Sequence, residues 1–211
     1  RVFHSFHRVP ITVEELQLKE TTGTHQRVID MVAHELITKE RIEEWKELPG
    51  VAPGVDISRD IVKLAAIERH KNTGHVGLGF LGKYGLKKGA VATSIGHDSH
   101  NLVIAGVTDE DMVLAGNRVI ENGGGLAIAL EGKVLADLPL PIGGLMADEP
   151  VEVVDEKLEH MKKLSVELGI SEDIDAFMTL AFISLPVIPK LRLNTYGVVD
   201  VEKHQVVEAR F

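Results

Sequence analysis

The sequence contains no cysteine, so it cannot form a disulfide or use a thiolate as a nucleophile or metal ligand. Aromatic residues make up only 4% of its 211 residues, and its core must therefore rely on Val, Ile, Leu and Ala. No apolar run approaches the length of a membrane span, and residues 1–10 lack the apolar core of a signal peptide. These absences fit a reducing compartment, and we expect a soluble, cytoplasmic protein.

Positive charge is also scarce. The chain has 23 Lys and Arg against 32 Asp and Glu, which gives a formal net charge of −9. Nucleic-acid backbones and anionic membranes both select basic surfaces, so we expect neither as a partner. The remaining composition, 44% hydrophobic and 26% charged, is that of an ordinary globular protein.

Common metal-binding and nucleotide-binding motifs are missing. The chain has no His-x-His, no His-x-x-x-His and no Walker sequence. Residues 77–82 (GLGFLG) repeat the Gly-x-Gly-x-x-Gly spacing, but they lack the strand-then-helix frame that aims backbone amides at a pyrophosphate. That spacing is a weak signal by itself.

Short apolar runs, separated by Gly, Lys or Asp/Asn clusters, predict a fold rich in β-strands. The pair Glu131-Gly132 predicts a tight hairpin between two of them. Because several strands follow one another without helices, we expect an α+β fold with a mixed, mainly antiparallel sheet. The expected strands are 61–67, 76–80, 90–94, 102–107, 126–130, 134–138, 191–193 and 198–207.

Two helices are expected to cover one side of this sheet. The first, 108–122, begins at Thr108, a residue type that caps helices, and is followed by acids that suit the helix dipole. The second, 148–168, has apolar residues at steps of three and four positions. We expect Asp148 to cap it and Pro150 to lie in its first turn.

The chain divides at a Pro/Gly-rich loop, residues 49–54. We therefore expect a connecting segment with short strands at 1–60 and an α+β domain at 61–211. The first residue is Arg rather than Met, which suggests that 1–18 is the tail of something larger. Residues 177–189 are apolar but broken by two prolines, so an irregular, turn-rich segment is expected there.

The motif GHDSHN lies between two expected strands and is the strongest candidate for a functional loop. In one interpretation, His97, Asp98 and His100 contact a metal, a bound base or a proton in transit. In the other, Asp98, Ser99 and Asn101 only form a turn and cap neighbouring amides. The residues alone leave both open.

His97 and His100 are weak candidates for metal ligands. Their spacing allows shared coordination from a loop, and Asp98 could add an oxygen. A catalytic metal needs about three protein ligands, and spacing identifies no third histidine. The same holds for His4 and His7, which repeat the spacing near the N-terminus.

Residues 68–71 (ERHK) end an expected strand with four polar side chains. Glu68 or His70 could act as an acid, a base or a hydrogen-bonding partner there, although such runs are more commonly a solvated strand end. Both polar runs lie at strand ends, so we expect Glu68 or His70 to lie beside the GHDSHN loop.

Several stretches together resemble the C-terminal region of adenine deaminases of the amidohydrolase superfamily. They occur in family order, and the combination of HDSHN with LPLPIGGLM and FMTL is specific. Residues 1–60 match less clearly, and 27–38 would be strand-like if they follow the family. The stretches are LAAIERHK (64–71), GHVGLGFLGKYGLKKG (74–89), ATSIGHDSHNLVI (92–104), TDEDM (108–112), LPLPIGGLMADEP (138–150) and FMTLAFISLPVIP (177–189).

The resemblance implies a parent enzyme of purine salvage that hydrolyses adenine to hypoxanthine and ammonia. In this family a (β/α)₈ barrel binds divalent metal, iron or manganese, through a His-x-His pair and further His, Glu and Asp residues. A metal-bound hydroxide attacks C6 of adenine. This chain has none of those motifs, and a barrel by itself needs about 250 residues. The catalytic barrel is therefore not expected in this chain, which alone should be inactive.

The resemblance also implies that the barrel domain of the same protein is the partner and adenine the substrate of the whole enzyme. The candidate catalytic residues are then His97, Asp98 and His100, with Glu68, His70, Ser99 and Asn101 as candidates near the substrate. The HDSHN loop could close over the barrel mouth, or the domain could only support assembly. Apolar segments at 138–146 and 177–189 either favour a homo-oligomer or pack against the missing barrel. The alternative is a free-standing ligand-binding or oligomerisation domain without catalysis.

Overall fold

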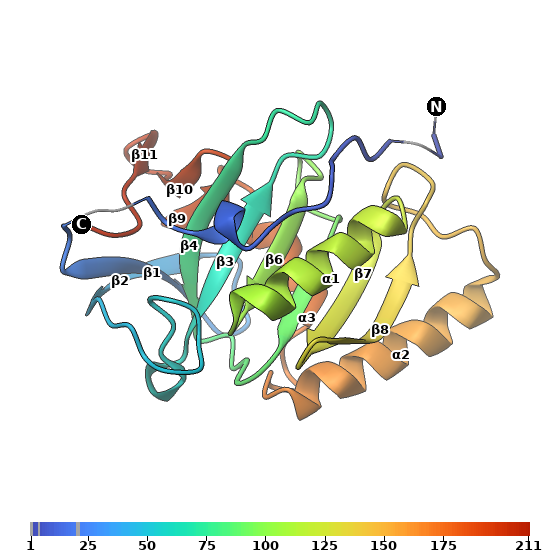
Figure 1. Ribbon diagram of the computed structural model, residues 1–211, viewed down its shortest axis with the longest axis horizontal. Coiled ribbons are helices and arrows are strands. Elements are labelled where there is room, and N and C mark those ends of the chain that lie inside the picture. The colour runs from blue at the N-terminus through green and yellow to red at the C-terminus, as the bar shows by residue number, and fades with distance from the viewer. Residues whose placement is uncertain (1, 4, 20–21) are drawn as a thin grey trace.

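The computed structural model of the protein describes residues 2–3, 5–19 and 22–211. Its main feature is a twisted sheet, which has eight strands within these residues, in the order β2-β1-β4-β3-β6-β5-β7-β8 (Figure 1). β1 and β4 pair in parallel, and the other neighbours in this sheet pair antiparallel. The expected α+β fold with a mainly antiparallel sheet is therefore confirmed. The strands are β1 (His25–Met31), β2 (Thr38–Glu44), β3 (Ile61–Ile67), β4 (Val76–Gly82), β5 (Ala90–Thr93), β6 (Leu102–Gly106), β7 (Gly125–Leu130) and β8 (Lys133–Pro139).

The central strands are buried on both faces. In β3 all seven residues are buried, and Leu64 and Ala66 pack into one apolar cluster while Ala65 and Ile67 pack into another. A strand that is apolar at successive positions needs cover on both sides, whereas an alternating strand needs it on one. The sheet therefore forms the middle layer of the domain.

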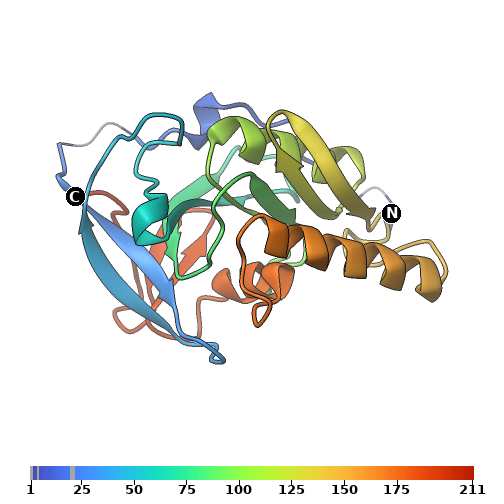
Figure 2. The same cartoon turned by 90° about the horizontal axis from the view of Figure 1, so that it is seen from below.

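The two faces are covered by different elements, as Figure 2 shows. One carries α1 (Asp109–Glu121) and the N-terminal segment with the 3₁₀ turn η1 (Glu14–Leu16). The other carries α2 (Val151–Glu167), α3 (Ala176–Ile183) and a small antiparallel sheet. The prediction that both expected helices lie on one side is thus wrong. The small sheet consists of β9 (Leu191–Asn194), β10 (Gly197–Asp200) and β11 (Gln205–Val207).

α1 follows its sequence signals. The Thr108 side chain accepts a hydrogen bond from the Asp111 amide, as an N-cap should. The buried ammonium of Lys63 on β3 lies 2.7 Å from the Asp109 carboxylate, which ties the first turn of the helix to the sheet. The hairpin turn after β7 also forms as expected, with φ of 50° at Glu131 and 75° at Gly132.

Other local expectations need correction. Asp148 does not cap α2, because the helix begins only after Pro150, which occupies the cap position without a side-chain bond. The residue before a proline avoids helical geometry, so the helix cannot begin earlier. Residues 176–183 form α3 rather than an irregular segment, because Asp175 caps this helix and Pro186 lies beyond its end. The expected strand 198–207 is two strands, β10 and β11, joined by a turn.

Residues before 61 also contribute to the sheet. β1 and β2 form its edge, and β1 joins the remainder through its parallel contact with β4. The strand-like character implied for 27–38 therefore applies as far as Met31, after which a turn leads to Thr38. Among the described residues, no helix has the length and apolar character needed to cross a membrane.

Candidate functional site

The pairing of β3 with β6 brings the two polar runs together. These strands are antiparallel, with Ile67 opposite Leu102, so the chain leaving β3 lies beside the chain entering β6. Residues 68–71 and the loop 96–101 therefore meet at one end of the sheet. The neighbourhood follows from strand register rather than from sequence proximity.

Direct contacts join the loop to the strand end. The Nε2–H of His70 donates to the Ser99 carbonyl at 2.6 Å, and Arg69 Nε donates to the His100 carbonyl at 2.5 Å. The structure thus places His70 beside the loop. Both contacts are to backbone carbonyls, which leaves the loop's own side chains available for other partners.

Glu68 has a different environment. Its carboxylate accepts hydrogen bonds from the amides of His70, Lys71 and Thr73 and from the Thr73 hydroxyl. Burial by itself raises the pKa of Glu68, but these hydrogen bonds outweigh it and hold the pKa at about 2. A carboxylate so engaged shapes the turn after β3 and remains ionised at neutral pH.

Arg69 is a residue of this site that the sequence pattern did not single out. Its side chain is only 1% exposed and reaches three segments of the chain. Besides the His100 carbonyl, Nη2 donates to the Gly143 carbonyl at 3.0 Å, and the guanidinium lies 4.9 Å from the centre of the Phe6 ring. Burial lowers the pKa of Arg69. The only available signal was an arginine two positions after a strand that is apolar except at Lys63.

α3 positions the other end of the loop. The His97 amide donates to the Ala181 carbonyl at 2.9 Å, and the Ser184 hydroxyl donates to the His97 carbonyl at 3.3 Å. The imidazole of His97 stacks on Phe182, with 4.9 Å between ring centres. The Asp98 side chain is exposed, with its carboxylate 3.4 Å from His97 Nδ1.

His100 and Asn101 carry polar atoms without partners. Burial lowers the pKa of His100, and the positive charge of Arg69 adds to this, so its imidazole is neutral at neutral pH. Within the described residues, His100 Nδ1 and Asn101 Oδ1 are buried and have no hydrogen-bond partner. Buried polar atoms are normally paired, so the loop has unused hydrogen-bonding capacity at these two atoms.

The loop does not fit a resident metal. A catalytic ion needs about three protein ligands, and no group of three His, Cys, Asp or Glu residues among those described is arranged to hold one. His97 and His100 supply two imidazoles, with 6.2 Å between ring centres, and the charged Arg69 next to His100 would repel a cation. His4, named with His7 as a further pair, lies outside the described residues.

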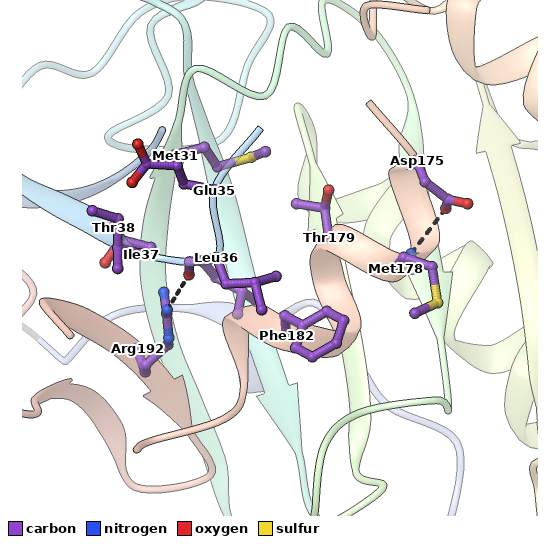
Figure 3. A pocket seen from close by; sticks show the side chains of 11 residues that line it. Met31, Glu35, Leu36, Ile37, Thr38, Asp175, Met178, Thr179, Phe182 and Arg192 are labelled. Atoms are coloured by element: carbon purple, nitrogen blue, oxygen red, sulfur yellow. Dashed lines mark hydrogen bonds between the residues drawn. The ribbon is translucent and has the colours of Figure 1, made fainter. Parts of the chain in front are cut away.

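A cleft of about 180 Å³ opens beside the loop, between the β1–β2 turn and α3 (Figure 3). Phe182, which stacks on His97, also lines it. At its base lies Arg192, which is 1% exposed and whose pKa burial lowers to about 10. The lining residues are Met31, Glu35, Leu36, Ile37, Thr38, Asp175, Met178, Thr179, Phe182, Ile183 and Arg192.

Comparison with known families agrees with this fold and with the motifs that converge on the loop. Residues 35–205 match the family described as "Adenine deaminase C-terminal domain". The chain belongs to this family. The resemblance inferred from HDSHN, LPLPIGGLM and FMTL is thereby confirmed.

Curated relatives of this adenine deaminase C-terminal domain share up to about half of its residues. It is 48% identical to "Adenine deaminase 2" of Carboxydothermus hydrogenoformans, over 93% of this chain and 34% of the relative. It is 47% identical to "Adenine deaminase" of Kosmotoga olearia, over 92% of this chain and 34% of the relative. A third relative, "Adenine deaminase" of Lysinibacillus sphaericus, is 40% identical over 98% of this chain and 36% of the relative. The chain thus spans about a third of the length of the relatives it matches.

Proposed function

We propose that this domain is the C-terminal part of an adenine deaminase and that its HDSHN loop covers the active site of a preceding barrel domain. The whole enzyme would hydrolyse adenine to hypoxanthine and ammonia in purine salvage. The observation that carries the proposal is the pair of buried, unpartnered atoms on the loop, His100 Nδ1 and Asn101 Oδ1. They occur where the family motif lies, and a purine or a barrel residue would supply their hydrogen bonds.

The divalent metal of the enzyme, iron or manganese, belongs in this proposal to the barrel. The loop lacks a third ligand, and the positive charge of Arg69 adjoins His100. This domain would therefore contribute binding and orientation rather than metal coordination. The assembled enzyme is proposed to be cytoplasmic and homo-oligomeric.

The loop residues suit different tasks in such a lid. His100 is held neutral, so it can either donate to or accept from a ring nitrogen of the purine. His97 and Asp98 form a partly exposed pair that can exchange protons with the substrate or solvent. Ser99 and Asn101 offer further hydrogen bonds at the rim.

Two residues of the strand end support the loop in this proposal. His70 holds the Ser99 carbonyl, and Glu68 shapes the turn that carries His70. A lid that closes over the purine would separate the site from bulk solvent while leaving the attacking water inside it. Its benefit depends on how precisely the loop is held, because small displacements of positioning groups are costly in catalysis.

Complementation between two chains tests the proposal. Supplied with iron, manganese or zinc, the 211-residue chain alone should not release ammonia from adenine. Adding the barrel segment of the same enzyme as a second chain should restore turnover. In that mixture, His100→Ala should lower turnover at least tenfold while changing thermal stability little, and His160→Ala on exposed α2 is the matched control.

Three outcomes contradict the proposal in different ways. Ammonia release by the isolated, metal-loaded chain would show a complete site here. A barrel that is fully active without this chain would remove the role of the lid. Equal loss of turnover and stability in His100→Ala would reduce the loop to a structural element.

A further inference from the structure

The cleft beside the loop has an apolar rim that is open to solvent. Leu36 is 53% exposed, Ile37 39% and Met178 44%, and all three line the same cleft. Figure 3 shows Leu36 facing Phe182 across the opening, with the β1–β2 turn on one side and α3 on the other. Single exposed apolar residues are ordinary, but apolar side chains gathered around a concave site indicate a binding surface.

The cleft is preformed because both of its walls are fixed. Arg192 donates to the Leu36 carbonyl, and the Thr38 hydroxyl donates to the Leu191 carbonyl at 2.8 Å. These hydrogen bonds hold the β1–β2 turn against β9. On the opposite wall, Asp175 caps α3 by accepting from the amides of Phe177 and Met178. A rigid cleft loses little conformational entropy when it is filled, which favours binding.

Its chemistry selects an apolar side chain rather than an anion. The guanidinium of Arg192 already donates to the carbonyls of Leu36, Pro189 and Leu191. The carboxylates of Glu35 and Asp175 line the same cleft and would repel a second anion. A cavity of about 150 Å³ with apolar walls accommodates a benzene ring, so one of about 180 Å³ accepts one aromatic or branched aliphatic side chain.

We propose that the part of the parent protein that precedes this domain docks in this cleft. One apolar side chain of that part enters the cleft, and a basic residue of the same part lies beside Glu35. The inference rests on the proposed function. The relatives are about three times as long as this chain, so most of the protein that they represent lies outside it. If the HDSHN loop faces the barrel, the apolar rim next to it faces the barrel too.

The arrangement couples docking to the loop. Phe182 forms the wall of the cleft and stacks on His97, so a side chain seated in the cleft fixes the ring against which His97 lies. Docking therefore positions the loop over the barrel mouth, and one contact surface serves both assembly and the active site.

Hydrogen exchange on the full-length parent enzyme tests the inference. Peptides covering 31–38 and 176–183 should exchange at least tenfold more slowly in the parent than in the 211-residue chain. Leu36→Glu and Met178→Glu should return these peptides to the rates of the isolated chain. Val151→Glu, a similarly exposed apolar position on α2, should leave them protected.

The outcomes separate this inference from the proposed function. Equal exchange in the parent and in the isolated chain would overturn the docking site, even if the parent deaminates adenine. Protection in a parent that does not deaminate adenine would support docking while removing the proposed function. A third outcome would assign the cleft to a second copy of the chain and overturn the inference. In that case the isolated chain would show protection at high concentration, and sedimentation would show dimers that Leu36→Glu abolishes.

Discussion

The imidazole of His97 stacks on the ring of Phe182, with 4.9 Å between centres and 29° between planes. The two residues are separated by 85 positions along the chain, and they meet because the start of the GHDSHN loop packs on α3. The contact connects the family motif to the cleft beside it. Arg69 and His70 hold the loop from the opposite side, through the carbonyls of His100 and Ser99.

Removing the Phe182 ring should loosen the loop. We expect Phe182→Ala to lower the free energy of unfolding by about 1–3 kcal/mol, because a partly buried aromatic contact is lost. Hydrogen exchange at the His97 amide should also accelerate, since its acceptor, the Ala181 carbonyl, lies on the same helix. Urea unfolding and exchange measured by NMR check both effects. Met178→Ala, which truncates an exposed residue of α3, should change stability by less than about 0.5 kcal/mol.

Arg69 should not tolerate even a conservative replacement. Lysine keeps the charge but cannot reach the carbonyls of His100 and Gly143 together, because it lacks the planar fork of donors. We expect Arg69→Lys to cost about 2–3 kcal/mol, as two buried acceptors lose a charged donor. Thermal unfolding measures this loss. An effect no larger than that of Arg118→Lys, whose side chain forms surface ion pairs with Asp137 and Glu121, would contradict the role assigned to Arg69.

His100 should make stability depend on pH in the weakly acidic range. Its pKa is lowered in the folded domain from 6.5, so the unfolded chain binds a proton more readily than the folded one. The neutral imidazole is therefore accommodated above pH 6.5, and stability falls as the pH drops below that value. Urea midpoints between pH 7.5 and 5 should show this slope, and His100→Gln should flatten it. A variant with an unchanged slope would show that other groups produce it.

Glu68 should affect stability over a more acidic window. Its folded pKa of about 2 lies below the ordinary 4.5, so its contribution is complete above pH 4.5 and is lost as the pH falls toward 2. Glu68→Gln should cost about 1 kcal/mol at neutral pH, because an amide oxygen replaces a charged acceptor of several hydrogen bonds. The stability difference between the two proteins should vanish near pH 2. A difference that persists at that pH would point to packing rather than charge.

Elements coded by neighbouring residues were predictable. Strand β3 was expected at 61–67 and has those bounds, because its apolar run, interrupted only by Lys63, ends at a polar cluster. Thr108 caps α1, and Glu131-Gly132 forms the hairpin turn, since each of these signals acts within a few residues. The motif HDSHN was identified by its composition alone. In each case the physical cause lies inside the segment that shows the pattern.

The prediction from sequence was wrong where a segment carried both helix-forming and helix-breaking residues. Pro186 and Pro189 suggested an irregular segment, but the Asp175 cap and the apolar face that packs on β5 and β6 make residues 176–183 helical. The distribution of helices over two faces was missed for a related reason. The sequence shows that β3 is apolar at every position except Lys63, but it does not show which face of the sheet each helix covers.

The sequence by itself determined the family, the predominance of antiparallel strands and the place of the polar loop, because composition and short-range spacing carry those properties. Only the tertiary structure decided that Arg69 holds the loop, that His97 rests on Phe182 and that a cleft opens beside them. Each of these depends on strand register and helix packing between residues far apart in the chain. Burial then shifts the titration of single groups, since the pKa values of His100 and Arg192 fall only after the fold removes these side chains from water.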